Sequence, residues 1–92
     1  MNIAFDPAKD ALNRAKHGVS LADFAGFDAA PVVRRDDRFD YGERRYRAYG
    51  RIGGVGHCLV FSLNDGAMRA ISFRRAHEKE MRRYEKTAST GL

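Results

Sequence analysis

The chain has 92 residues, 43% of them hydrophobic and 32% charged, so it can bury one modest core but not two. No run approaches the ~20 apolar residues that span a bilayer, and the first residues lack the pattern of a signal peptide. These features argue against a membrane protein. We expect one cytoplasmic domain over residues 1–88, followed by a flexible tail at residues 89–92.

The net charge is +5, and 13 of the 17 basic residues are arginine, whose planar fork grips phosphate with two hydrogen bonds. The positive excess lies in two blocks. Residues 32–51 hold seven basic and four acidic side chains, and residues 69–92 hold seven and three. This clustering favours a partner that carries phosphate.

The first elements predicted are a short strand over residues 2–5 and a helix. Asp6 is a suitable N-cap, Pro7 fits the first helical position, and Gly18 supplies a left-handed stop after residue 16 or 17. Small and apolar residues at helical spacing give this helix a thin stripe: Ala8, Ala11, Leu12 and Ala15.

A second helix is predicted to open at Ser20, with Asp23 three residues later in a capping box. Val19 and Phe24 are placed to form a hydrophobic staple across its start. The residues expected to be buried in this helix are Leu21, Phe24, Ala25 and Phe27.

A polar stretch over residues 31–42 predicts a short extended segment and a mobile surface loop. Alternation then predicts a strand over residues 45–52 with one basic and aromatic face, made of Arg45, Arg47, Tyr49 and Arg51. A glycine turn at residues 53–56 leads into the next strand.

Residues 57–63 are apolar on both sides and predict a central strand, and a turn at residues 64–66 leads into a strand over residues 68–73. A final helix from about Ala76 packs on the sheet. The predicted fold class is α+β, with an antiparallel sheet of three to four strands, two N-terminal helices and one C-terminal helix.

The predicted arginine face combines guanidinium forks for phosphate with rings for unpaired bases, as in proteins that bind single-stranded RNA. Arg69 lies on a strand near this face, and Arg74 and Arg75 stand where the last strand leaves the sheet. The alternative is a solvated face that is partly paired with nearby carboxylates: Asp36, Asp37, Asp40 and Glu43.

Lys16 and His17 end the first helix, where a cation stabilises the helix dipole; alternatively, the imidazole serves as a general base or acid. Tyr84 lies on the inward stripe of the last helix and belongs either to the core or to a substrate site. Histidines without nearby ligands and a single apolar-flanked Cys58 predict no metal site, and no cofactor motif is present.

Several short segments, taken in order, resemble the BrnT toxins of the RelE-like superfamily along nearly the whole chain. They are residues 5–9 (FDPAK), 16–20 (KHGVS), 42–46 (GERRY), 48–50 (AYG) and 69–76 (RAISFRRA), with Glu80 and Tyr84. The resemblance implies a RelE-like ribonuclease toxin and a BrnA-like antitoxin, a ribbon-helix-helix dimer that forms a heterotetramer with the toxin. Operator DNA would be bound only through that antitoxin.

RNA cleavage without a metal proceeds by attack of the 2′-OH on the adjacent phosphorus, which needs a proton acceptor, a proton donor and cations. We assign phosphorane stabilisation to Arg45, Arg74 and Arg75, the proton acceptor to His17 or Glu43, and assistance to Tyr84. RNA binding is expected from Lys16, Arg47, Tyr49, Arg51 and Arg69. The alternative function is a non-catalytic nucleic-acid-binding or co-repressor module.

Overall fold

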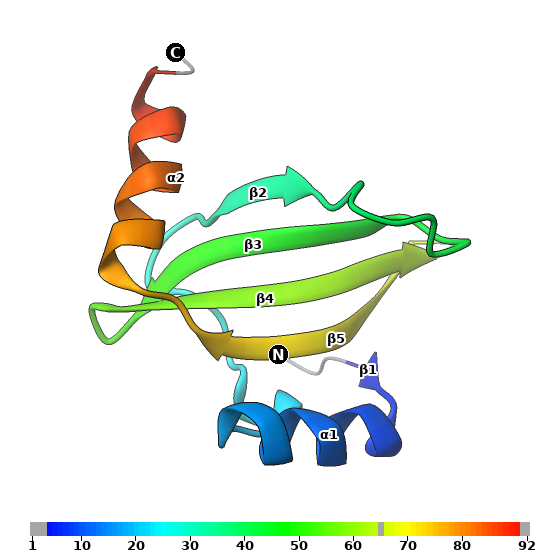
Figure 1. Ribbon diagram of the computed structural model, residues 1–92. Coiled ribbons are helices and arrows are strands. Elements are labelled where there is room, and N and C mark those ends of the chain that lie inside the picture. Colours follow the sequence, from blue (N-terminus) through cyan, green and yellow to red (C-terminus); the bar gives the residue numbers. More distant parts are fainter. Residues whose placement is uncertain (1–3, 65, 91–92) are drawn as a thin grey trace.

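The computed structural model describes residues 4–64 and 66–90 (Figure 1). In chain order the elements are β1 (Ala4–Phe5), α1 (Pro7–His17), the 3-10 turn η1 (Leu21–Asp23), β2 (Val32–Arg35), β3 (Arg45–Ile52), β4 (Val55–Asn64), β5 (Ala67–Arg75) and α2 (Glu78–Thr90). The strands form one sheet in the order β1-β5-β4-β3-β2.

The α+β class is confirmed, but the arrangement of the sheet differs from the prediction. The sheet has five strands and is mixed, because β1 pairs in parallel with β5 while the other neighbours are antiparallel. The predicted start of the first strand at residues 2 and 3 lies outside the described residues, as does Asp65 of the predicted hairpin turn. Helix α2 reaches Thr90, two residues into the expected tail.

Helix α1 has the predicted ends, with the Asp6 carboxylate accepting from the Ala8 N–H and Gly18 in the left-handed conformation at φ 74°. The four residues of its predicted apolar stripe are nevertheless exposed, and Leu12 is 71% exposed. The buried residue of α1 is Asn13. Its side-chain amide donates to the Phe73 carbonyl at 2.9 Å and accepts from the Phe73 N–H at 3.0 Å, so α1 satisfies the backbone at the edge of β5.

The predicted second helix is only the three-residue turn η1. The capping box of Ser20 and Asp23 forms as expected, but Phe24 is extended and ends the turn. This path lets Phe24 pack edge-to-face on both Phe27 and Phe73, with ring centroids 5.0 and 5.5 Å apart. Aromatic packing against the sheet therefore replaces continued helix. Leu21 and Phe24 are buried as predicted, whereas Ala25 is exposed.

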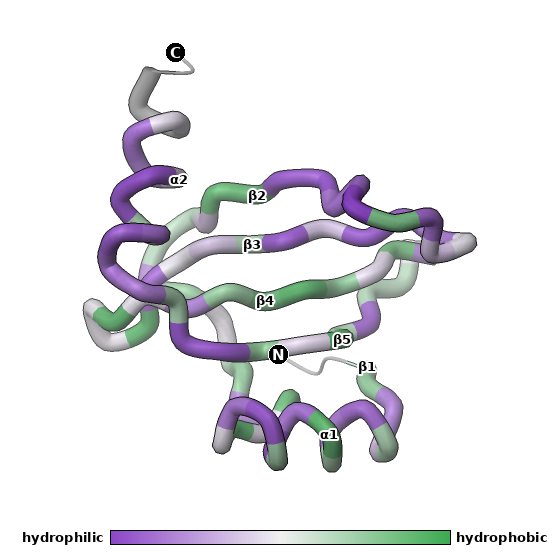
Figure 2. Tube along the Cα trace, in the orientation of Figure 1, coloured by the Kyte–Doolittle hydropathy of each residue, from purple (hydrophilic) through white to green (hydrophobic). Residues whose placement is uncertain are grey.

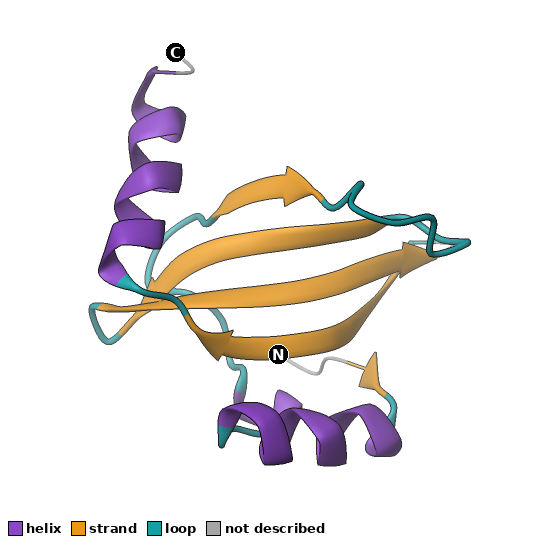
Figure 3. Ribbon diagram, in the orientation of Figure 1, coloured by secondary structure: helices purple, strands orange, loops and turns teal. Residues whose placement is uncertain are grey.

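Helix α1 lies alongside β5, and helix α2 stands at the end of the sheet where β5 leaves it (Figure 3). One face of the sheet holds the main core, made of Leu21, Phe24, Ala48, Leu59, Phe61, Ala70 and Phe73. Helix α2 crosses one end of the other face, where Met81 packs against Gly56. A Cβ added to Gly56 would lie only 2.3 Å from the Met81 Cγ, so this contact requires glycine. Figure 2 shows that α2 is largely hydrophilic while β4 beneath it is mostly hydrophobic.

Arg51 attaches α2 to the sheet. Its guanidinium binds Glu78 at 3.0 Å and Glu85 at 2.9 Å and donates to the Gly54 carbonyl. Because this arginine is used in ion pairs within the fold, its predicted role in RNA binding receives no support from its surroundings. No helix in the described part of the chain is long and apolar enough to cross a membrane.

Candidate active site

A cavity of about 480 Å³ opens on the sheet face that α2 crosses. Six basic and two acidic side chains line it, together with His17 and three tyrosines. The lining residues that sequence analysis predicted as functional come from α1, β3, β5 and α2: Lys16, His17, Arg45, Arg47, Tyr49, Arg74 and Tyr84. The fold thus brings most of the predicted site into one strongly cationic hollow.

The register of the sheet explains why residues far apart in sequence meet in this cavity. Tyr49 on β3 lies opposite Cys58 on β4, which lies opposite Arg74 on β5. Side chains of paired residues project to the same face. The predicted basic face of β3 and the end of β5 therefore form one continuous surface.

Arg47 occupies the floor of the cavity beside two phenols. Its Nη1 donates to the Tyr49 hydroxyl at 3.3 Å and to the Tyr84 hydroxyl at 3.5 Å, while its Nε is buried without a hydrogen-bond partner among the described residues. The two tyrosine rings stack at 3.9 Å. Burial, followed by the hydrogen bond with Tyr84, raises the pKa of Tyr49 well above its usual range.

This stack changes the role of Tyr49. Its side chain is fully buried, at 2% exposure, and Tyr84 covers its ring. Tyr49 therefore does not offer the open ring that stacking on a base requires. The sequence left two alternatives for Tyr84, the core or a substrate site. Tyr84 meets both descriptions, because it packs against a small cluster that includes Tyr49 and Met81 and also lines the cavity.

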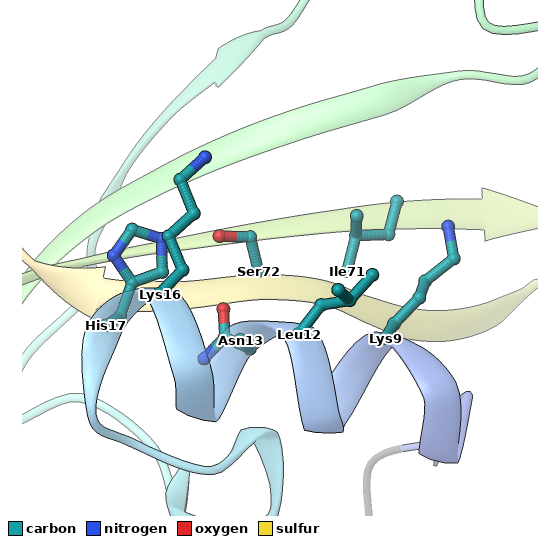
Figure 4. A pocket seen from close by; sticks show the side chains of 7 residues that line it. All are labelled: Lys9, Leu12, Asn13, Lys16, His17, Ile71 and Ser72. Carbon is teal, nitrogen blue, oxygen red and sulfur yellow. The ribbon is translucent and has the colours of Figure 1, made fainter.

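Lys16 and His17 form the cavity wall at the C-terminal end of α1. Partial burial, then the charges of Lys16 and Arg74, lower the pKa of His17 below its ordinary value. This shift favours the neutral imidazole, the form that can accept a proton. Figure 4 shows both side chains beside Ser72, next to a groove of about 230 Å³ between α1 and β5.

Arg74 is held by Glu80, a residue of α2 that was named in the sequence motif but not assigned to the site. The guanidinium donates to both carboxylate oxygens, at 3.0 and 2.9 Å. This pairing lowers the pKa of Glu80, so both groups stay charged. In contrast, Lys16, Arg47 and Arg83 form no ion pair within residues 4–64 and 66–90.

A buried carboxylate organises the loop between β2 and β3, which the sequence predicted to be mobile. Asp36 accepts two hydrogen bonds from the Arg38 guanidinium at 2.8 Å and one from the Tyr41 hydroxyl at 3.3 Å. The bonds from Arg38 hold the pKa of Asp36 at about 2. The Arg45 guanidinium lies 4.1 Å from the centroid of the Tyr41 ring. Sequence analysis gave Arg38 and Tyr41 no role in the site and considered Asp36 only as a carboxylate that pairs with the arginine face, since polar loop composition carries no signal for such a network.

Besides Arg51, three predicted residues lie outside the cavity. Glu43 pairs with Arg45 at 3.3 Å and with Asn64 at 3.1 Å in a neighbouring hollow. Arg75 is opposite His57 and projects to the other face of the sheet from Arg74. Arg69 is exposed on β5 near the far end of the same face as Arg45, because both residues pair with Ser62.

The described residues contain no group of three or more histidine, cysteine, aspartate or glutamate side chains that could hold a metal ion. No curated protein and no solved structure matches the chain, so the RelE-like fold stays a prediction. A family model described as the ribonuclease toxin BrnT of type II toxin–antitoxin systems matches residues 5–80. The chain therefore belongs to the BrnT family of ribonuclease toxins, whose members act with a cognate antitoxin.

Proposed function

We propose that the cavity cleaves RNA without a metal ion, through attack of a 2′-OH on the adjacent phosphorus. The O2′–P bond forms as the hydroxyl proton passes to a base, the P–O5′ bond breaks, and the leaving 5′-oxygen takes up a proton. The products are a 2′,3′-cyclic phosphate and a 5′-hydroxyl. The observation that carries this proposal is the meeting of His17 with six basic side chains in one cavity, where the pKa of His17 is lowered.

His17 is the proton acceptor in this proposal. Its lowered pKa keeps the imidazole unprotonated near neutral pH, and it lines the cavity beside Lys16 and Arg74. Glu43, the other acceptor considered from the sequence, is bound to Arg45 and lies outside the cavity. The surroundings of the two groups therefore favour His17.

Arg74, Arg45 and Arg47 supply positive charge for the phosphorane, and Lys16 adds a cation at the wall. Guanidinium groups suit this task because they bind two phosphate oxygens at once. In this proposal Tyr84 assists the leaving group; in support, it lines the cavity and its hydroxyl lies 3.5 Å from the Arg47 Nη1. Arg75 faces the other side of the sheet and therefore does not stabilise the phosphorane in this proposal.

The test is cleavage of single-stranded RNA by purified toxin in excess EDTA. We expect fragments with 2′,3′-cyclic phosphate ends, and no cleavage of the same sequence made with 2′-O-methyl nucleotides. Cleavage that stops in EDTA and returns with added metal would contradict the metal-independent mechanism. RNA that is bound in a salt-dependent manner but stays intact would instead support the non-catalytic module.

We further propose that the toxin acts in the cytoplasm, inhibits translation and growth, and is neutralised by a BrnA-like ribbon-helix-helix antitoxin in a heterotetramer. Carboxylates of the antitoxin would pair with Arg45, Arg47 and Arg74 and so exclude RNA from the cavity. In the complex, these arginines should become protected from modification by a dicarbonyl reagent. Full reactivity in the complex would contradict neutralisation at this face.

A further inference from the structure

Phe39 is a large aromatic side chain that the fold leaves open to solvent. It lies in the loop between β2 and β3 and is 70% exposed. Its ring meets the Tyr41 ring edge-to-face, with centroids 5.9 Å apart. Neither aromatic residue is needed for the proposed chemistry, so the pair calls for a separate explanation.

Hydrogen bonds order the loop that presents the aromatic pair. The Tyr41 hydroxyl donates to buried Asp36, and the same carboxylate binds Arg38 with two hydrogen bonds. The Gly42 N–H donates to the Asp40 side chain at 3.0 Å. A ring presented by an ordered loop loses little conformational entropy when it binds a ligand.

The pair also adjoins the catalytic cavity. Phe39 lines a second hollow of about 230 Å³, which shares Asp36, Tyr41 and Arg45 with that cavity. The Arg45 guanidinium covers one face of Tyr41 at 4.1 Å, which leaves Phe39 as the open ring. Three arginines and four carboxylates line this hollow, and Arg35 is paired with Asp37 and Arg45 with Glu43. The positive charge that would hold the phosphates of a bound strand therefore comes from the adjoining cavity, whose lining has six basic and two acidic side chains.

We propose that Phe39, backed by Tyr41, is a base-stacking subsite for a nucleotide that flanks the scissile phosphate. The inference rests on the proposed ribonuclease chemistry and specifies its substrate. Every base has a π face, so the subsite accepts any base but requires that the base be unpaired. The toxin consequently prefers single-stranded RNA, with little dependence on sequence at this position.

The experiment measures binding of a 2′-O-methyl oligoribonucleotide that contains 2-aminopurine, a base whose fluorescence is quenched by stacking. Phe39→Ala should weaken binding about 5- to 100-fold and abolish the protein-dependent quenching at one position. Phe39→Trp should retain both. Leu63→Ala is the matched control. Leu63 is also an exposed apolar residue, at 40% exposure, but it lies on the sheet face opposite to the cavity.

An abasic substrate separates stacking from a general effect on the loop. If Phe39 stacks on one base, removing that base should weaken wild-type binding by the same factor and should cost Phe39→Ala nothing further. If removal of the base and Phe39→Ala weakened binding independently of each other, the proposal would be wrong. It would also be wrong if Phe39→Ala left RNA binding unchanged and weakened binding of the antitoxin. The oligonucleotide cannot be cleaved, so this result is independent of whether unmodified RNA is cut.

Discussion

Replacing His17 with glutamine should slow cleavage of single-stranded RNA about 100- to 10,000-fold, as expected for the loss of a general base. Glutamine keeps a polar side chain of similar reach but cannot accept the 2′-OH proton. Single-turnover cleavage with saturating toxin measures the chemical step without the contribution of binding. RNA affinity should change little, since the cationic side chains of the cavity remain.

The pH dependence of cleavage gives a second readout of His17. The imidazole must be neutral to act as a base, so the rate should rise with pH and level off above the pKa of this group. Because the pKa is lowered, the inflection should lie below the ordinary histidine value of 6.5. The residual activity of His17→Gln should lack this acid limb.

His77→Gln is the matched control, because His77 is exposed and does not line the cavity. It should keep both the rate and the pH profile of the wild type. If His17→Gln folds normally and retains the acid limb, another group accepts the proton and the assignment to His17 is wrong.

Local signals in the sequence were sufficient to predict the helix and strands that carry the site. The caps at Asp6 and Gly18 set the ends of α1, and hence the position of His17 at its last turn. Period-two alternation placed Arg45, Arg47 and Tyr49 on one face of β3. The same alternation puts Arg74 and Arg75 on opposite faces of β5, which does not agree with assigning both to one phosphorane.

Contacts between distant segments decided the features that the sequence did not predict. β1 is too short to show by pattern that it joins β5 in parallel. Asn13 is a polar residue in a helix interior, and its use at the edge of β5 depends on a neighbour sixty residues away. Burial of Tyr49 likewise depends on where α2 crosses the sheet, because a strand pattern does not reveal what covers a face.

Arg74→Ala should reduce the rate of RNA cleavage about 100- to 1,000-fold, the loss typical when a preorganised charge-stabilising group is removed from an active site. Its neighbour provides a matched control. Arg75 carries the same charge one residue away but faces the other side of the sheet, so Arg75→Ala should cleave at close to the wild-type rate. Equal losses in the two variants would indicate general electrostatic attraction rather than a positioned guanidinium.

A variant of Glu80, the ion-pair partner of Arg74, distinguishes the effect of Arg74 on catalysis from its effect on stability. Removing Arg74 alone leaves the Glu80 carboxylate, which is partly buried, without its two hydrogen bonds and so lowers the free energy of unfolding. Combining Arg74→Ala with Glu80→Ala removes that unpaired charge, and thermal denaturation should show stability partly restored. Cleavage should stay as low as in Arg74→Ala, because the guanidinium is still missing. If the double variant regained activity along with stability, Arg74 would serve only to hold α2 in place.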